Sequence, residues 1–282
     1  MYLARQVASG GLDPQRMKSE FKALLRRFLP RSIHKHRILG GPLRGYRIVT
    51  SWHDYPAPIT GRTERPLLEW FAKNVKLGET WLDIGAHYGY TAIALSRLVG
   101  MQGRVFAFEP TPATLAQLVA NVMLNGFNGV HLNQKAVSEK SGTSLLYLYK
   151  QNSLNSLARQ DWMGQPLGQI AIETVTLDEY VSEQALPRVD LIKIDVEGAE
   201  ILVLKGARQL LNGPNPPVVI CEFSDKTTHG FGYDATELRQ FLEDQGYKLY
   251  RWELGSRSLV PEPKRSNYIT IYANLIGVKE KI

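Results

Sequence analysis

The sequence contains a single cysteine, Cys221, among 282 residues. One cysteine cannot form a disulfide within the chain or supply a cysteine-rich zinc site. It lies in the apolar run Val218–Cys221 and is expected to be a buried core residue. No apolar run approaches the ~18–20 residues of a membrane-spanning helix, and the N-terminus lacks an apolar stretch followed by a cleavage site. These absences predict a cytoplasmic protein, because a lone thiol suits a reducing compartment.

Acidic residues are scarce in the first part of the chain. Residues 1–40 hold nine Lys/Arg and two Asp/Glu, whereas residues 41–282 hold 25 of each sign. Apolar residues recur there at helical spacing, with basic residues on the other side. The apolar positions are Met17, Phe21, Leu24, Leu25, Phe28 and Leu29, and the basic ones are Lys18, Lys22, Arg26 and Arg27. We therefore predict that residues 1–56 form a basic N-terminal extension with an amphipathic helix.

Three interpretations of this helix remain open. It packs its apolar stripe on the main domain or on a second subunit, which would be self-association. Alternatively, it lies on an anionic membrane surface, at the inner face of the membrane, or docks an acidic substrate. Nucleic acid is the least favoured partner, because a neutral body with one basic arm lacks an extended face that tracks phosphates.

Strand and helix patterns alternate along residues 57–282, the predicted main domain. This alternation predicts an α/β fold with a doubly wound, mostly parallel sheet, and the last two strands are expected to form an antiparallel edge. The expected strands are residues 80–84, 104–108, 130–137, 144–149, 189–194, 218–223, 247–253 and 267–276. The expected helices are residues 65–76, 88–99, 112–125, 199–211 and 234–245, with a short one opened by the capping box Thr176–Glu179.

A glycine-containing turn follows the first of these strands. It has the pattern Asp83-x-Gly85-x-x-x-Gly89, and Glu109 ends the next strand. Glycine permits a sharp strand-to-helix turn and close approach of a ligand to the backbone, and an acid after the second strand accepts ribose hydroxyls. A dinucleotide fingerprint would place glycine where Asp83 stands. Because a carboxylate repels pyrophosphate but attracts an ammonium group, we predict S-adenosylmethionine (SAM) as the cofactor. An ordinary βαβ unit with a glycine turn is the simpler alternative.

A second cluster of acids follows two later strands. Asp195 and Glu197 lie in the turn after residues 189–194, and Glu222 ends residues 218–223. They are the predicted catalytic candidates, with Asp195 first, as a base that removes a hydroxyl proton. A Mg²⁺ site formed by the same three residues and simple capping of the next helix by Asp195 or Glu197 remain alternatives. Glu200 is expected to pair with Lys193, Lys205 or Arg208.

Substrate selection is expected to reside outside these motifs. Residues 151–169 form a long polar loop, and long loops often cover sites. The segment Ser224–Tyr233 and the basic arm are the other candidates. Trp162, Phe231 and Tyr233 could stack on a sugar ring or could equally be core residues.

A series of motifs makes the chain resemble the FkbM-type SAM-dependent methyltransferases. The match runs from about residue 60 to residue 225, and the string Lys193–Glu200 is specific to that family. The motifs are Asp83–Tyr90, Phe108–Pro110, Asn121–Gly126, Lys135–Ser138, Thr176–Asp178, Ile192–Glu200, Leu204–Gly206 and Glu222. The resemblance implies a class I methyltransferase (Rossmann-like) fold with a seven-stranded sheet. It also implies methyl transfer to a hydroxyl oxygen, usually of a sugar or a polyketide-like natural product.

The resemblance also implies roles for individual residues. Cofactor contacts are implied for Asp83, Gly85, Ala86 and Gly89, and ribose binding for Glu109. We further predict cofactor contacts for His87, Ala136 and Asp195. His87 stands where the family often has asparagine, so it would touch the cofactor, act as a base or be structural. Lys135 and Ala136 replace the acid that often holds the adenine amine, so backbone groups are expected to make that contact.

The function expected from the sequence is therefore SAM-dependent O-methylation of a small molecule or glycan. Two alternatives belong to other classes. A nicotinamide-dependent oxidoreductase is disfavoured by Asp83 and by the absence of a Tyr-x-x-x-Lys pair. A non-catalytic SAM-binding scaffold that recruits partners through its arm is disfavoured by the three acids at the predicted rim.

Overall fold

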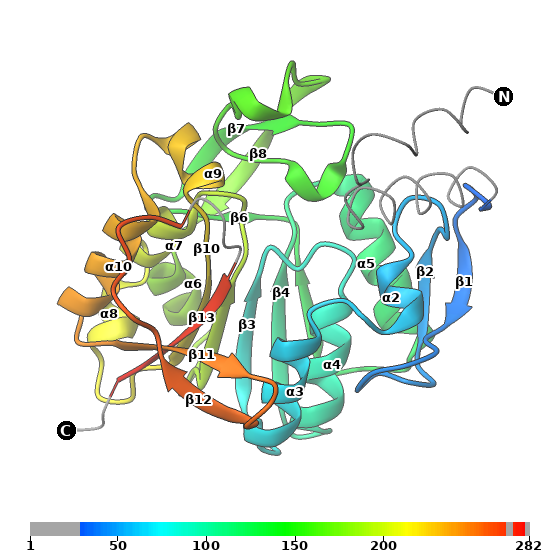
Figure 1. Cartoon of the computed structure of the whole chain (residues 1–282), viewed down its shortest axis with the longest axis horizontal. Helices are drawn as coiled ribbons and strands as arrows, with labels where there is room; N and C mark the ends of the chain where they lie inside the picture. Colours follow the sequence, from blue (N-terminus) through cyan, green and yellow to red (C-terminus); the bar gives the residue numbers. More distant parts are fainter. Residues whose placement is uncertain (1–28, 269–272, 280–282) are drawn as a thin grey trace, which may run out of the picture. The chain divides into compact units, whose positions relative to one another are not determined.

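The computed structural model describes residues 29–268 and 273–279 (Figure 1). Contacts divide the chain into two compact units between Thr63 and Glu64, and the sequence places the boundary slightly earlier, after residue 56. In the first unit, strand β1 (His34–Arg37) pairs antiparallel with β2 (Arg47–Thr50), and α2 (Ala57–Thr60) follows. The amphipathic helix predicted from Met17 onward lies outside the described residues. No described helix is long and apolar enough to cross a membrane.

An eight-stranded sheet forms the centre of the second unit. Its order is β12-β11-β13-β10-β9-β3-β4-β5, and the strands from β10 to β5 are parallel, whereas β13, β11 and β12 pair antiparallel. The strands are β3 (Thr80–Ile84), β4 (Arg104–Phe108), β5 (Val130–Asn133), β9 (Leu191–Ile194), β10 (Val218–Phe223), β11 (Lys248–Glu253), β12 (Ser258–Pro261) and β13 (Ala273–Val278). The predicted doubly wound sheet is confirmed, with β12 as an additional edge strand.

Helices flank this sheet on both faces, as Figure 1 shows. They are α3 (Arg65–Asn74), α4 (Tyr90–Val99), α5 (Pro112–Leu124), α6 (Leu177–Glu183), α7 (Glu200–Lys205), α8 (Arg208–Asn212), α9 (Asp225–Thr228) and α10 (Ala235–Asp244). Leu82 and Ile84 of β3 share one hydrophobic cluster with residues of α6, α7 and α10. Trp81 instead packs edge-on against Phe71 of α3, with ring centroids 5.2 Å apart. Because side chains alternate along a strand, Asp83 lies on the α3 face.

A small second sheet, in the order β6-β8-β7, accompanies the main one. It contains β6 (Ala136–Val137), β7 (Gly142–Leu148) and β8 (Gly168–Val175). The single strand predicted over residues 130–137 is therefore wrong, because the chain leaves the main sheet after Asn133. The loop between β7 and β8 contains the 3₁₀ turns η1 (Asn152–Leu154) and η2 (Asp161–Met163), and η3 (His229–Phe231) follows α9.

The helix predicted over residues 199–211 is divided into α7 and α8 at Gly206. A Cβ atom at Gly206 would lie 2.2 Å from the carbonyl oxygen of Ser138. The backbone at Gly206 therefore lies against the segment around Ser138, and the helix is interrupted where the two segments meet. The local sign of this break in the sequence is Gly206 itself, because glycine is unfavourable inside a helix.

Candidate functional site

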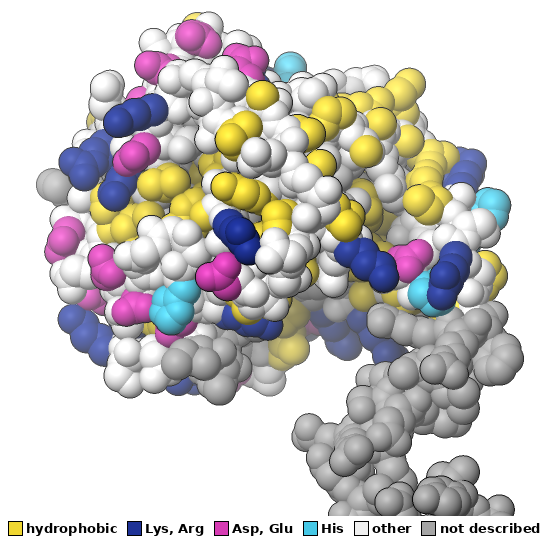
Figure 2. Space-filling view, turned by 90° about the horizontal axis from the view of Figure 1, so that it is seen from above, with side chains coloured by type: hydrophobic (Ala, Val, Ile, Leu, Met, Phe, Trp, Pro, Cys, Tyr) yellow, Lys and Arg dark blue, Asp and Glu magenta, His cyan; other side chains and the backbone are white. Residues whose placement is uncertain are grey.

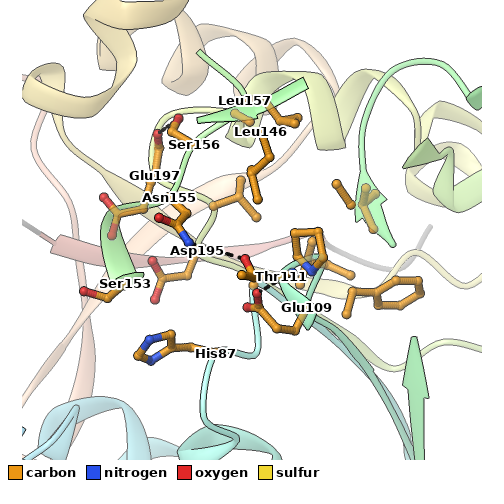
Figure 3. A pocket seen from close by; sticks show the side chains of 18 of the residues that line it. His87, Glu109, Thr111, Leu146, Ser153, Asn155, Ser156, Leu157, Asp195 and Glu197 are labelled. Atoms are coloured by element: carbon orange, nitrogen blue, oxygen red, sulfur yellow. Dashed lines mark hydrogen bonds between the residues drawn. The ribbon is translucent and has the colours of Figure 1, made fainter. Parts of the chain in front are cut away.

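A cleft with about 600 Å³ of empty space opens at the carboxyl ends of the parallel strands (Figure 3). It is bordered by the segments that follow β3, β4 and β9, together with β6, β7 and the loop after β7. β3 and β9 are direct neighbours, and their onward connections run to opposite sides of the sheet. This is the topological switch point where open α/β sheets bind ligands. The sequence places its candidate residues at this edge.

The turn after β3 needs glycine because other segments of the protein pack closely against its backbone. Gly85 has φ = 79°, and a Cβ atom there would lie 1.9 Å from the carbonyl oxygen of Asp195. Gly89 has φ = 81°, and its Cβ would lie 2.2 Å from a methyl carbon of Leu118 on α5. Gly85 lines the cleft, whereas Gly89 and Ala86 are not among the lining residues. Gly89 thus allows α4 to pack on α5.

Glu109 lies at the end of β4 and lines the cleft. It is only 7% exposed, and its Oε1 accepts a hydrogen bond of 2.9 Å from the backbone N–H of Thr111. Burial raises the pKa of Glu109, and that hydrogen bond opposes the rise. The Nδ2 of Asn155 donates to the Thr111 hydroxyl at 3.4 Å. Thr111 stands just before Pro112, where the sequence predicts a side-chain cap for α5, but its side chain makes no capping hydrogen bond and makes this contact instead.

Asp83 is fully buried and is not among the residues that line the cleft. Its register partner on β9 is Lys193, whose Nζ lies 3.9 Å from Oδ1 of Asp83 and 2.9 Å from Oδ2 of Asp195. Neither oxygen of Asp83 accepts a hydrogen bond from the described residues, and burial raises the pKa of Asp83 to about 6. Burial alone lowers the pKa of Lys193, but the surrounding carboxylates raise it above its ordinary value.

Glu64 lies beside the same group of charges. It is the residue before α3 and has a left-handed backbone with φ = 45° and ψ = 36°. Its Oε2 is buried and accepts no hydrogen bond from the described residues. Burial raises the pKa of Glu64 to about 7, Lys193 opposes the rise, and Asp195 and Asp83 add to it. Sequence reasoning gives no role to Glu64, and it names Lys193 as a partner of Glu200 rather than of Asp83 and Asp195. Lys193 is the single charged residue inside the apolar strand Leu191–Ile194. That position is the sequence signal from which a buried ion pair could have been predicted.

The acids at the ends of β9 and β10, namely Asp195, Glu197 and Glu222, are each partly buried. Asp195 and Glu197 line the cleft, and Glu222 does not. Burial raises the pKa values of Glu197 and Glu222 well above the ordinary range, and Asp195 raises both further. The backbone of Glu197 is left-handed (φ = 54°). Its carbonyl accepts hydrogen bonds from Ser156 Oγ (2.9 Å) and Gln160 Nε2 (3.2 Å).

The turn into α7 is capped by Glu200, not by Asp195 or Glu197. Oε1 of Glu200 accepts hydrogen bonds from the backbone N–H groups of Val196 (3.1 Å) and Gly198 (3.2 Å). The predicted pairing of Glu200 with Lys193, Lys205 or Arg208 is therefore wrong, because its carboxylate turns back to its own backbone. Asp195 and Glu197 remain available to the cleft.

His87 lines the cleft and contacts the loop after β7. Its Nε2 lies 3.3 Å from Oδ1 of Asn152, and its ring stacks on Tyr88 at 3.8 Å. Burial lowers the pKa of His87 to about 4, so its imidazole is neutral at pH 7. A ring with so low a pKa is a weak proton acceptor, so His87 suits a positioning role better than that of a base.

The loop predicted to cover the site does border it. Five of its residues line the cleft, namely Asn152, Ser153, Asn155, Ser156 and Leu157. Gln160 anchors the loop, because its Nε2 donates to the carbonyls of Thr227 (2.7 Å) and Glu197. Trp162 is 39% exposed and lies under Lys226, whose Nζ is 3.7 Å from the ring centroid. Tyr233 is a core residue, with its hydroxyl donating to the Gly198 carbonyl.

The remaining predicted contacts concern adenine and metal. Ala136 lines the cleft beside Lys135 and Val137, where the sequence expects backbone contacts to adenine. Within residues 29–268 and 273–279, no group of three or more His, Cys, Asp or Glu side chains is arranged to hold a metal ion. The Mg²⁺ alternative for Asp195, Glu197 and Glu222 therefore has no support in the described part of the chain.

Comparison with known proteins gives consistent matches. The profile described as "Methyltransferase FkbM domain" matches residues 83–249. The 2-O-methyltransferase NoeI of Sinorhizobium fredii is 28% identical over 161 residues, covering 51% of this chain and 63% of the relative. The hexuronic acid methyltransferase AglP of Haloferax volcanii is 27% identical over 158 residues, covering 56% and 62%. The chain thus spans less than two thirds of the length of these relatives.

Solved methyltransferase structures match the chain at low identity. An O-methyltransferase from Bacillus cereus, in complex with SAH, matches with a TM-score of 0.46 and 14% identity, covering 76% of this chain and 80% of that one. The family itself is established by the profile, which spans more than half of the chain and includes the turn after β3, Glu109 and the acids after β9. The chain belongs to the FkbM methyltransferase domain family.

Proposed function

We propose that this protein is a SAM-dependent O-methyltransferase that acts on a hydroxyl group of a sugar, glycan or related natural product. The observation that carries the proposal is the placement of the Gly85 turn, Glu109 and Asp195 around one cleft at the switch point of the sheet. Family membership supports the same reaction class. AglP, a hexuronic acid methyltransferase, supports a sugar-like acceptor.

The residues of the cleft fit the cofactor. Glu109 is positioned by Thr111 to accept ribose hydroxyls, and Ala136, Leu146 and Leu157 offer an apolar surface for adenine. Beyond Gly85, the buried oxygens of Asp83 accept no hydrogen bond from the described residues and suit an ammonium group. When bound, SAM supplies an electrophilic sulfonium methyl group. The protein has to exclude water and hold the acceptor hydroxyl in line, which is largely a positioning task.

Asp195 is the proposed proton acceptor. It lines the cleft and points into it in Figure 3. Lys193 donates a hydrogen bond of 2.9 Å to one carboxylate oxygen, Oδ2, which fixes the side chain. Glu197, which also lines the cleft, is the next candidate. Glu222 does not line the cleft and is the third. Glu197 and Glu222 have raised pKa values, so they suit donation of hydrogen bonds to the acceptor better than removal of its proton.

Transfer assays with defined acceptors test this function. The protein is incubated with SAM and a panel of neutral glycosides, uronic acids and hydroxylated polyketides, and mass spectrometry looks for products in which a methyl group has replaced a hydroxyl hydrogen. Calorimetry with SAM and with NAD runs in parallel. Binding of NAD in preference to SAM would favour the oxidoreductase alternative. Binding of SAM without transfer to any acceptor would favour the scaffold alternative.

The partners of the basic arm remain predictions. Self-association and binding to an anionic membrane surface both stay predictions, as does the cytoplasmic location.

Figure 2 shows acidic and basic side chains interspersed on the visible face. This mixture matches the balanced charge of residues 41–282 and does not favour a nucleic acid acceptor.

A further inference from the structure

Glu64 has an unusual backbone for its residue type. Its φ of 45° lies in the left-handed region, and the next two residues, Arg65 and Pro66, begin α3. A residue with a side chain adopts this conformation at a cost in free energy, and such strain persists where the surrounding structure holds it, often at functional sites. Glycine would fit this backbone without strain. The presence of glutamate therefore calls for a role of its carboxylate.

Three carboxylate oxygens near Glu64 are buried and accept no hydrogen bond from the described residues. They are Oε2 of Glu64 and both side-chain oxygens of Asp83. Buried polar atoms in native proteins almost always have a partner. Among the described residues, their one ion-pair contact is that of Asp83 with Lys193 at 3.9 Å, and Lys193 itself donates a hydrogen bond to Asp195. These oxygens need hydrogen-bond donors that the described chain does not provide.

The charges of this group are also incomplete. Lys193 acts electrostatically on Glu64, Asp83 and Asp195 alike. One ammonium group against three carboxylates leaves two negative charges when all are ionised. Burying charges without a partner is costly. A ligand that brings a cation with several N–H donors would supply both the missing charge and the missing hydrogen bonds.

The position of the group indicates which part of the cofactor meets it. Glu109 follows β4, and Asp195 follows β9, with β3 between these two strands. Neighbouring strands lie about 4.8 Å apart, so the two ends are separated by about 10 Å. A nucleoside whose ribose meets Glu109 therefore extends its tail across Gly85 toward Asp83, Asp195 and Glu64. The ammonium group of SAM lies at the far end of that tail.

We propose that Glu64 belongs to the cofactor site and, with Asp83, binds the ammonium group of the methionine moiety. This inference rests on the proposed function, because it assumes that SAM occupies the cleft. It adds a residue that lies before the family match at residues 83–249. It also assigns a purpose to the strained backbone in front of α3.

Ligands with and without the amino-acid tail test the proposal. Calorimetry measures binding of SAM, S-adenosylhomocysteine and 5′-methylthioadenosine, which keeps the nucleoside but lacks the ammonium group. Glu64→Gln is expected to weaken SAM and S-adenosylhomocysteine by about tenfold or more and to leave methylthioadenosine unchanged. Glu69→Gln is the matched control on the same helix, because its carboxylate pairs with Arg65 at 2.9 Å, and all three affinities should stay unchanged.

The outcomes separate this proposal from the proposed function. Equal weakening of all three ligands, or no weakening, would overturn the role of Glu64 while SAM binding by the wild type stands. A wild-type protein that binds none of them would overturn the proposed function as well. If Glu64→Gln does not fold, Glu64→Gly serves instead, because glycine accepts the left-handed backbone. It should melt no earlier than the wild type and show the same tail-selective loss.

Discussion

The two ends of the cleft are built on different principles. At the β4 end, the carboxylate of Glu109 already holds the N–H of Thr111 at 2.9 Å, so its geometry is set before any ligand arrives. At the β9 end, both side-chain oxygens of Asp83 and Oε2 of Glu64 are buried and accept no hydrogen bond from the described residues. The first end is preorganised by the protein, whereas the second stores unfavourable charge that a cationic ligand would relieve. The contrast teaches that recognition of the nucleoside and of its tail can be varied separately.

The largest expected effect concerns Asp195. Asp195→Asn removes the proposed proton acceptor but keeps the shape of the side chain. Turnover should fall by about 10²–10⁴-fold, whereas SAM binding is retained. Single-turnover kinetics and calorimetry measure the two quantities. Asp161→Asn, whose side chain is 94% exposed, is the control and should change neither. Normal turnover of the Asp195 variant would exclude it as the base.

Lys193 should matter most for stability. Lys193→Met leaves the fully buried carboxylate of Asp83 and the partly buried ones of Asp195 and Glu64 without their cation. Removing one partner of a buried ion pair typically costs about 3–5 kcal/mol in the free energy of unfolding, which denaturant titration measures. The double variant Lys193→Met with Asp83→Asn should recover part of the loss, because one unpaired charge is gone. A loss no larger than that of a surface lysine variant would show that this end carries little charge.

Glu109 tests the other end of the cleft. Glu109→Gln removes the charge that is proposed to bind ribose hydroxyls. SAM and 5′-methylthioadenosine should both weaken by about tenfold, since both carry the ribose. Calorimetry with the two ligands checks this. A loss confined to SAM would mean that Glu109 acts on the tail, and the division into two ends would fail.

The pH dependence should be smaller and should differ between the free and the bound protein. Burial raises the pKa of Asp83 to about 6 and those of Glu64 and Glu200 to about 7. Such groups hold their protons more tightly when folded. The stability they contribute is therefore present at acidic pH and is lost as pH rises through about 6–7. A bound cation favours the ionised forms of Asp83 and Glu64.

The rise in melting temperature caused by SAM should accordingly grow from about pH 5 to about pH 8. Differential scanning fluorimetry across that range measures it. The Glu64→Gln variant should show a flatter dependence, because one of the titrating groups is gone. A rise that is the same at every pH would indicate that neither carboxyl meets the ligand charge.

Local patterns predicted much of the fold and part of the site. The bounds of β3, β4 and β10 follow from short apolar runs closed by glycine or charge, and they agree with the structure. The turn after β3 and the acids after β4 and β9 are also local signals. Long-range contacts decided what local patterns could not. Lys193 meets Asp83 through strand pairing, Glu64 joins them from in front of α3, and Ser138 divides the helix at Gly206.

The left-handed backbone around the cleft has a consequence for binding entropy. Gly85 and His87 on one side and Glu197 and Gly198 on the other all have positive φ. Gly85 and Gly198 are moreover wedged against the carbonyls of Asp195 and Thr227. Turns held in one backbone conformation have few alternative conformations to lose when a ligand binds. The entropy cost of ordering them is then small, and little binding free energy is lost to it. These turns should therefore bind the cofactor with little change in conformation. Adaptation to different acceptors would then fall to the loop between β7 and β8.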